Sequence, residues 1–188
     1  MPQNPNLAPT DKAAVIHMEF GKRTESMMDW GFTLPGKMDV INARIETIFE
    51  TGMFERFIQQ KRCLIPAMGF YEWAGEKGNK QPWCFRLQEE RPLMLAGVWR
   101  EYVGKKQFAI LTTCANSLLD GIHDRMPCIV PPEHEDLWLT GDPSQAVEKV
   151  YDPHSAEIMT SYRVTKAMGN PKYKSPDVYE PLRSLFDD

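Results

Sequence analysis

CLIPAMGFYEW, at residues 63–73, carries the strongest secondary-structure signal in this chain. Its two halves, 63–67 and 69–73, are short runs of apolar and aromatic residues, a composition that favours strands. A polar turn at 75–80 leads to a third run of the same kind at 83–87. Three short strands in such close succession predict a sheet that is largely antiparallel.

The rest of the chain continues this pattern, with more strands than helices. Apolar residues at helical spacing from Ile45 to Ile58 predict one longer helix, which Gly52 weakens in its middle. Further strands are expected at 16–20, 27–32, 93–99, 108–113 and 158–164, short helices at 131–139 and 144–150, and a loop-like tail at 170–188. The expected fold class is therefore α+β, a single domain over residues 1–188 with mostly antiparallel strands and flanking short helices.

Length and composition agree with one globular domain. A chain of 188 residues that is 42% hydrophobic and 26% charged lies near the globular average, which excludes a disordered chain, collagen and a coiled coil. No apolar run approaches the roughly 20 residues of a membrane helix. The first residues, 1–6, show no basic region followed by an apolar core, so no secretory signal is visible. We expect a cytoplasmic protein without a membrane partner.

The net charge and the cysteine pattern bear on whether the protein binds nucleic acid or metal and whether it forms disulfides. A net charge of −4 argues against a general nucleic-acid coat, but it is compatible with a local basic groove. The four cysteines form no CxxC pair, and three of them lie in apolar runs that are typical of buried thiols. We therefore expect no structural zinc, no other metal, no cofactor and no disulfide.

The segment Asn-Ala-Arg at 42–44 and the carboxylate of Glu72 are two candidates for chemistry. Asn42 stands just before the helix expected from Ile45, so it is either a helix N-cap or a functional amide. Glu72 is flanked by three aromatic residues, where burying an ionised carboxylate is costly. It is either a solvated residue at a strand edge, or a general acid or base whose pKa is raised in a cleft.

The segment His-Asp-Arg-Met-Pro at 123–127 is the third candidate. His123 is the side-chain type whose ordinary pKa lies nearest neutrality, and Arg125 offers a planar fork that suits phosphate or carboxylate. A lone histidine on a loop is commonly only solvated, but an acid, a base and an arginine so close together favour a functional site. The other histidines, at 17, 134 and 154, lack such neighbours and are expected at the surface.

Together these segments resemble the SRAP family, the SOS response-associated peptidase domain of the abasic-site processing proteins. GFYEW at 69–73 followed by HDRMP at 123–127 is the most specific pair of landmarks, and the resemblance covers nearly the whole chain. The other landmarks are NLAPT at 6–10, WG at 30–31, NAR with ET at 42–47, RCLIPA at 62–67, QP at 81–82, LTT at 111–113, Val164 and Asn170.

The resemblance implies a barrel-like strand core, binding of single-stranded DNA and capture of abasic sites in the DNA damage (SOS) response. In the family, an N-terminal cysteine condenses through its amine and thiol with the ring-opened abasic sugar and forms a thiazolidine crosslink. The family's catalytic residues fall on Asn42, Glu72 and His123. Glu72 would shuttle protons, Asn42 would orient the amine or the sugar, and His123 would act on the sugar side.

The resemblance also implies a set of DNA contacts. Arg44 and Arg125 would hold backbone phosphates, with Lys166 as a rim contact. Many members carry bulky aromatics after the tryptophan of the WG landmark, and Met38 would be a weaker apolar wedge in their place. The remaining expected contacts are Trp30 and Thr113. The implied partner is single-stranded DNA with abasic sites, bound by a monomer that is nucleoid-associated while on DNA.

The sequence departs from the family pattern at its beginning. Members begin Met-Cys-Gly-Arg and run much further before the NLAPT landmark, which here starts at Asn6, and residue 2 is Pro. The family's opening strand and nucleophile are thus absent from the printed sequence, and no internal cysteine has a free α-amine beside its thiol. Three explanations stay open: a late start or shortened sequence, a natural variant that has lost crosslinking, or a Pro2 amine that attacks aldehydes.

Three functions remain in view. The first is a repair protein that crosslinks abasic sites, and the second is a non-catalytic module on the same scaffold that binds single-stranded DNA. The third and weakest is a thiol peptidase, which needs a reactive thiolate near a base, and nothing in the sequence brings a cysteine beside His123. Whether the protein is an enzyme, as a hydrolase or a lyase, depends on this missing nucleophile.

Overall fold

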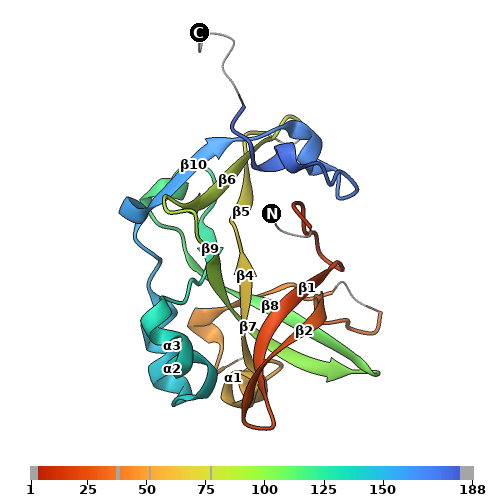
Figure 1. Cartoon of the computed structure of the whole chain (residues 1–188), viewed down its shortest axis with the longest axis vertical. Coiled ribbons are helices and arrows are strands. Elements are labelled where there is room, and N and C mark those ends of the chain that lie inside the picture. The colour runs from red at the N-terminus through yellow and green to blue at the C-terminus, as the bar shows by residue number, and fades with distance from the viewer. Residues whose placement is uncertain (1–3, 37–38, 51, 77, 183–188) are drawn as a thin grey trace.

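The computed structural model describes residues 4–36, 39–50, 52–76 and 78–182 (Figure 1). The strands are β1 (Lys12–Glu19), β2 (Lys22–Trp30), β3 (Asn42–Arg44), β4 (Arg62–Ala67), β5 (Phe70–Ala74), β6 (Gln81–Leu87), β7 (Leu93–Tyr102), β8 (Lys105–Cys114), β9 (Arg125–Pro127) and β10 (Met159–Arg163). The helices are α1 (Glu55–Gln60), α2 (Glu135–Thr140) and α3 (Pro143–Tyr151), with 3₁₀ turns at Ile45–Thr47, Ser117–Leu119, Pro132–His134, Ala156–Ile158, Lys166–Gly169 and Pro176–Tyr179.

Within the described residues, five strands close into a barrel. The order β2-β1-β4-β7-β8 is antiparallel throughout, and a parallel pairing of β8 with β2 closes the ring. β5, β6 and β10 form a second, antiparallel sheet, which lies at the top of Figure 1 while the α-helices lie at the bottom. The expected single α+β domain with a mostly antiparallel, barrel-like core is confirmed.

β8 is the strand on which the most pairings converge. Its first half pairs with β7 and β2, which completes the barrel, and its second half pairs with β3 and β9. In register, Arg44 of β3 lies opposite Thr112, and Arg125 of β9 lies opposite Cys114. Two segments far apart in sequence are thereby held beside one strand.

Strands β4, β7 and β8 of the barrel are apolar on both faces, because each face packs against other parts of the domain. Leu64, Val98 and Leu111 belong to one buried cluster with apolar side chains of all three α-helices, so this face is the outside of the barrel. Trp99 and Phe108 belong to a second cluster, which the first sheet shares with the second. A strand buried on both faces loses the alternation of apolar and polar residues that a half-buried strand shows.

Two expectations from the sequence are wrong. The helix expected from Ile45 to Ile58 is broken, because residues 48–50 and 52–54 form turns between a 3₁₀ turn and the short α1. Each piece buries its own apolar residues against the barrel. His17, expected at the surface, is 0% exposed, and its Nε2 lies 2.9 Å from the Ser26 hydroxyl.

Three findings concern membrane helices, metal sites and cysteines. Among the described residues, no helix is long and apolar enough to cross a membrane, and no cluster of His, Cys, Asp and Glu could hold a metal ion. Cys63, Cys84 and Cys128 are buried free thiols, and Cys114 is an exposed one.

Arg62 fastens two helices to the barrel. Its guanidinium is buried, with the residue 5% exposed, and it donates to the carbonyl oxygens of Ile58 at 2.7 Å, Gly141 at 2.6 Å and Trp138. These carbonyls lie in α1, in α2 and just after α2, and two of them are near helix C-termini, where the helix dipole favours a cation. Burial lowers the pKa of Arg62, and Asp142 opposes that shift.

We predict that Arg62→Met destabilises the fold by about 2–5 kcal/mol, because several buried carbonyl groups lose their donor together. Arg62→Lys should recover only part of the loss, since one ammonium cannot reach carbonyls of both helices. Urea unfolding of each variant measures the effect. The exposed Lys22→Met is the control, and Arg62→Met with a loss as small as the control's would contradict the prediction.

Candidate functional site

A cleft of about 1070 Å³ lies where the barrel, the second sheet and the segment before β1 meet. It is lined by Asn42 and Arg44 from β3, Glu72 from β5, and His123 and Arg125 at the start of β9. The structure therefore brings all three sequence segments singled out for chemistry to one concave surface. β8 holds β3 and β9 there, and the second sheet supplies β5.

Glu72 and His123 face each other in this cleft. Glu72 Oε2 lies 4.0 Å from His123 Nε2, and the side chains are 23% and 43% exposed, respectively. Burial raises the pKa of Glu72, and the nearby His123 and Lys80 oppose the shift. A carboxyl whose pKa is moved toward neutrality can both give and accept a proton, as a general acid or base must.

The hydrogen bonds of His123 are made by Nδ1. The backbone N–H of Arg125 donates to Nδ1 at 2.9 Å, which assigns the proton of the neutral ring to Nε2, on the side of Glu72. When the ring is doubly protonated, Nδ1 can instead donate to the Arg125 carbonyl at 3.2 Å or to the Asp124 carboxylate at 3.3 Å. Nδ1 therefore has partners both as an acceptor and as a donor, and Nε2 is the nitrogen that faces Glu72.

Arg125 is tied to a carboxylate that the sequence analysis gave no role. Its Nη1 and Nη2 donate to the two oxygens of Glu46 at 2.5 and 2.8 Å, and Nη2 also donates to the Thr112 carbonyl. The hydrogen bond from Arg125 lowers the pKa of Glu46. Glu46 was part of the landmark at 42–47, but no feature of the neighbouring sequence predicts its pairing with Arg125, 79 residues away.

Asn42 and Arg44 are open toward the cleft. Both are exposed, the Asn42 amide has no hydrogen-bond partner among the described residues, and Arg44 forms no ion pair with them. Trp30 is half-buried beside them, and its indole N–H donates to the Ile41 carbonyl at 3.0 Å, which holds the approach to β3 against β2. The functional amide is thus available, and the N-cap alternative for Asn42 does not apply because the residue lies in a strand.

Two expected DNA contacts do not line the cleft, and a third lies outside the described residues. Thr113 is 1% exposed and its hydroxyl donates to the Tyr151 carbonyl, because alternation along β8 turns its neighbour Thr112 toward the cleft instead. Lys166 is exposed and donates to Asn79 at 2.7 Å. Met38 lies outside the described residues.

The two ends of the described chain also line the cleft, which the sequence analysis missed. Asn6 is 5% exposed, and its amide donates to the carbonyls of Met168 at 2.8 Å, Asn170 at 3.2 Å and Tyr173 at 3.1 Å. Tyr71 donates from β5 to the carbonyls of Pro5 and Val178. The family landmarks near both ends of the sequence could have indicated that these segments belong to the site. That the two segments contact each other is visible only in the structure.

Comparison with known proteins now identifies this arrangement. The family model described as SOS response associated peptidase (SRAP) matches residues 1–171. The chain belongs to the SRAP family. A solved structure of a protein from Bacteroides thetaiotaomicron shares the SRAP fold seen here with a TM-score of 0.79 and 26% identity, over 93% of this chain and 82% of that one.

Relatives of this SRAP chain are abasic site processing proteins. YoqW of Bacillus subtilis (strain 168) is 32% identical over 93% of this chain and 84% of its own length. YedK of Escherichia coli (strain K12) is 26% identical over 94% of this chain and 84% of its own length. The cleft described above is therefore the candidate site of a member of an abasic site processing family.

We predict that Glu72→Gln stabilises the fold at pH 7. Burial raises the pKa of Glu72 above the unfolded value of about 4.3, so the folded state binds that proton more tightly, and stability is lost as the pH rises through this window. A glutamine does not ionise, so Glu72→Gln does not lose stability as the pH rises. Urea unfolding should show an advantage at pH 7 that shrinks at pH 4. The exposed Glu101→Gln is the control, and an advantage of equal size at both pH values would contradict the prediction.

Proposed function

We propose that this chain binds single-stranded DNA at an abasic site and holds the ring-opened sugar aldehyde between Asn42, Glu72 and His123. The observation that carries the proposal is the Glu72–His123 pair, 4.0 Å apart in a cleft with open amide and guanidinium groups at its side. Membership of the SRAP family, whose relatives include abasic site processing proteins, supplies the substrate class.

The chemistry of an aldehyde explains these three residue types. An amine that attacks the aldehyde carbon must lose a proton, and the oxygen must gain protons before it leaves as water. Glu72, with its raised pKa, exchanges protons on the amine side, and His123 does so through Nε2 on the sugar side. The Asn42 amide orients the sugar hydroxyls or the attacking amine.

Binding to the DNA strand rests first on phosphate contacts. Arg44 is exposed at the cleft, forms no ion pair with the described residues, and is the proposed phosphate ligand. Glu46 accepts hydrogen bonds from both terminal nitrogens of Arg125. A phosphate can therefore bind Arg125 only by displacing Glu46. Trp30 and the half-exposed Met27, which also line the cleft, offer apolar surfaces on which bases stack.

A covalent crosslink requires an amine and a thiol on neighbouring atoms of one residue. The amine and the aldehyde form an imine and release water, and the thiol then adds to the imine carbon and closes a thiazolidine. The cysteines of the printed sequence stand at 63, 84, 114 and 128, all inside the chain, and so lack the free amine. The 188 printed residues by themselves are therefore proposed to sense abasic DNA without crosslinking it.

Peptidase chemistry finds no support in the cysteines. None of the four, all of which lie in the described residues, lines the cleft. Burial raises the pKa of Cys63 and Cys128, and it raises that of Cys84 to about 11, so these thiols stay protonated at neutral pH. A thiol protease needs the opposite, a thiolate next to a base.

We predict that Arg44→Gln weakens binding to an abasic single-stranded oligonucleotide and lowers the slope of log K against log salt by about 0.7, the contribution of one phosphate contact. Fluorescence anisotropy at several salt concentrations measures both. Lys105→Gln, at the far end of β8, has the same charge change and should leave both unchanged. Equal effects of the two variants would contradict a specific role for Arg44.

We further predict that a polypeptide of the 188 printed residues binds abasic single-stranded DNA but leaves no crosslink on a denaturing gel after heating. Its amines form only an imine, which hydrolyses, although borohydride could trap it. We expect a crosslink from a version that carries the first residues of YoqW before NLAPT and so has a family N-terminus. In that version, Glu72→Ala should slow the reaction. A heat-stable crosslink from the unextended polypeptide would contradict our account of the nucleophile.

A further inference from the structure

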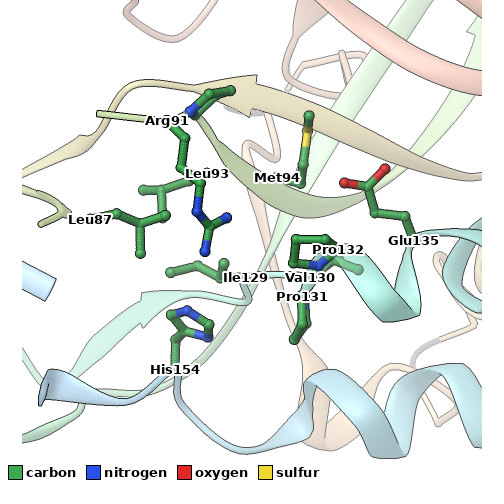
Figure 2. Close-up of a pocket in the computed structure, with 11 residues that line it drawn as sticks. Leu87, Arg91, Leu93, Met94, Ile129, Val130, Pro131, Pro132, Glu135 and His154 are labelled. Carbon is green, nitrogen blue, oxygen red and sulfur yellow. The ribbon is translucent and has the colours of Figure 1, made fainter. Parts of the chain in front are cut away.

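A second pocket, of about 190 Å³, lies beside the β6–β7 connection (Figure 2). Its walls come from that connection, from the segment between β9 and α2, and from the segment after α3. Pro92 lines both the pocket and the cleft, so the two sites share one wall. The site proposed for abasic DNA does not use this pocket.

The floor of this pocket is apolar and well packed. Leu87, Leu93, Ile129 and Val130 are between 1% and 6% exposed, so they are fixed parts of the core rather than a mobile surface. An isolated bridge pairs Ile129 with Leu95 of β7, which holds the floor to the barrel. An engineered cavity of about 150 Å³ in another protein holds benzene, so this pocket has room for about six to eight non-hydrogen atoms.

Two nitrogen groups converge at one end of the pocket. Figure 2 shows the Arg91 guanidinium and the His154 ring pointing toward each other from either side of Ile129. Glu89 fixes the Arg91 side chain through Nε at 2.7 Å. Within the described part of the chain, the terminal nitrogens of Arg91 and both ring nitrogens of His154 have no hydrogen-bond partner.

The opposite end of the pocket carries an acid that is already neutralised. Glu135 lines that end, as Figure 2 shows, and it pairs with Arg23 of β2 at 2.6 Å. A ligand with a single negative charge would therefore place that charge between Arg91 and His154 and its apolar part on the floor. A charge-assisted hydrogen bond from guanidinium to carboxylate suits the geometry of the fork.

We propose that this pocket binds a carboxylate carried on a short apolar chain, with the carboxylate between Arg91 and His154. A free aliphatic acid of about six carbons and the C-terminal leucine or isoleucine of a peptide both present this chemistry, and both fit the volume. Arg91 supplies the charge, His154 supplies a donor, and the floor selects for apolar bulk. The pocket is independent of abasic-site chemistry.

The test is an NMR titration of the 188-residue chain with 4-methylpentanoate and with its neutral isostere 4-methylpentanamide. We expect saturable shifts at the amides of Ile129 and Val130 and at the His154 ring with the acid, and at least tenfold weaker binding of the amide. Arg91→Gln should weaken the acid at least tenfold, and Arg56→Gln, which removes the same charge on α1, should leave its affinity unchanged.

Two peptide probes distinguish the sources of the carboxylate. If acetyl-Gly-Gly-Leu with a free C-terminus binds more tightly than 4-methylpentanoate, and its C-terminal amide does not bind, the pocket captures a chain end. If the free acid alone binds, the ligand is a small molecule. The proposal is overturned if 4-methylpentanoate gives no saturable shifts, if the isosteric amide binds equally well, or if correctly folded Arg91→Gln retains the parent's affinity.

Discussion

The backbone hydrogen bonds of β8 are the constraint on which the rest of this structure depends. One edge of the strand pairs first with β7 and then with β9, and the other edge pairs first with β2 and then with β3. The first pairings close the barrel, and the second deliver Asn42, Arg44 and Arg125 to the cleft. Because one continuous strand does both, the geometry of the site cannot be separated from the stability of the barrel.

The second sheet adds the acid to the cleft that the barrel begins. Glu72 comes from β5, whose pairing with β6 places it opposite Trp83, and it meets His123 only because the two sheets share a buried cluster. The same approach of the sheets removes water from Glu72 and raises its pKa. The contact between the sheets therefore has two effects: it stabilises the domain, and it raises the pKa of Glu72.

The arginines of this chain divide by what they contact, and not by where they stand in the sequence. Arg62 donates its hydrogen bonds to carbonyl groups in and beside the helices, and Arg125 donates to Glu46 and Thr112. Arg44 at the cleft and Arg91 at the second pocket keep terminal nitrogens open toward concave surfaces. The net charge of −4 is an average over the whole protein and does not show such local groups.

The sequence by itself determined the family, the α+β class and most strands, because short apolar and aromatic runs and fixed motifs are local signals. It also singled out Asn42, Glu72 and His123, whose residue types stand out from their neighbours. Only the tertiary structure decided that Glu46 holds Arg125, that the helix from Ile45 breaks, and that Thr112 rather than Thr113 faces the cleft. Those outcomes depend on strand register and on partners distant in sequence, where a shift of one residue reverses which side chain faces the site.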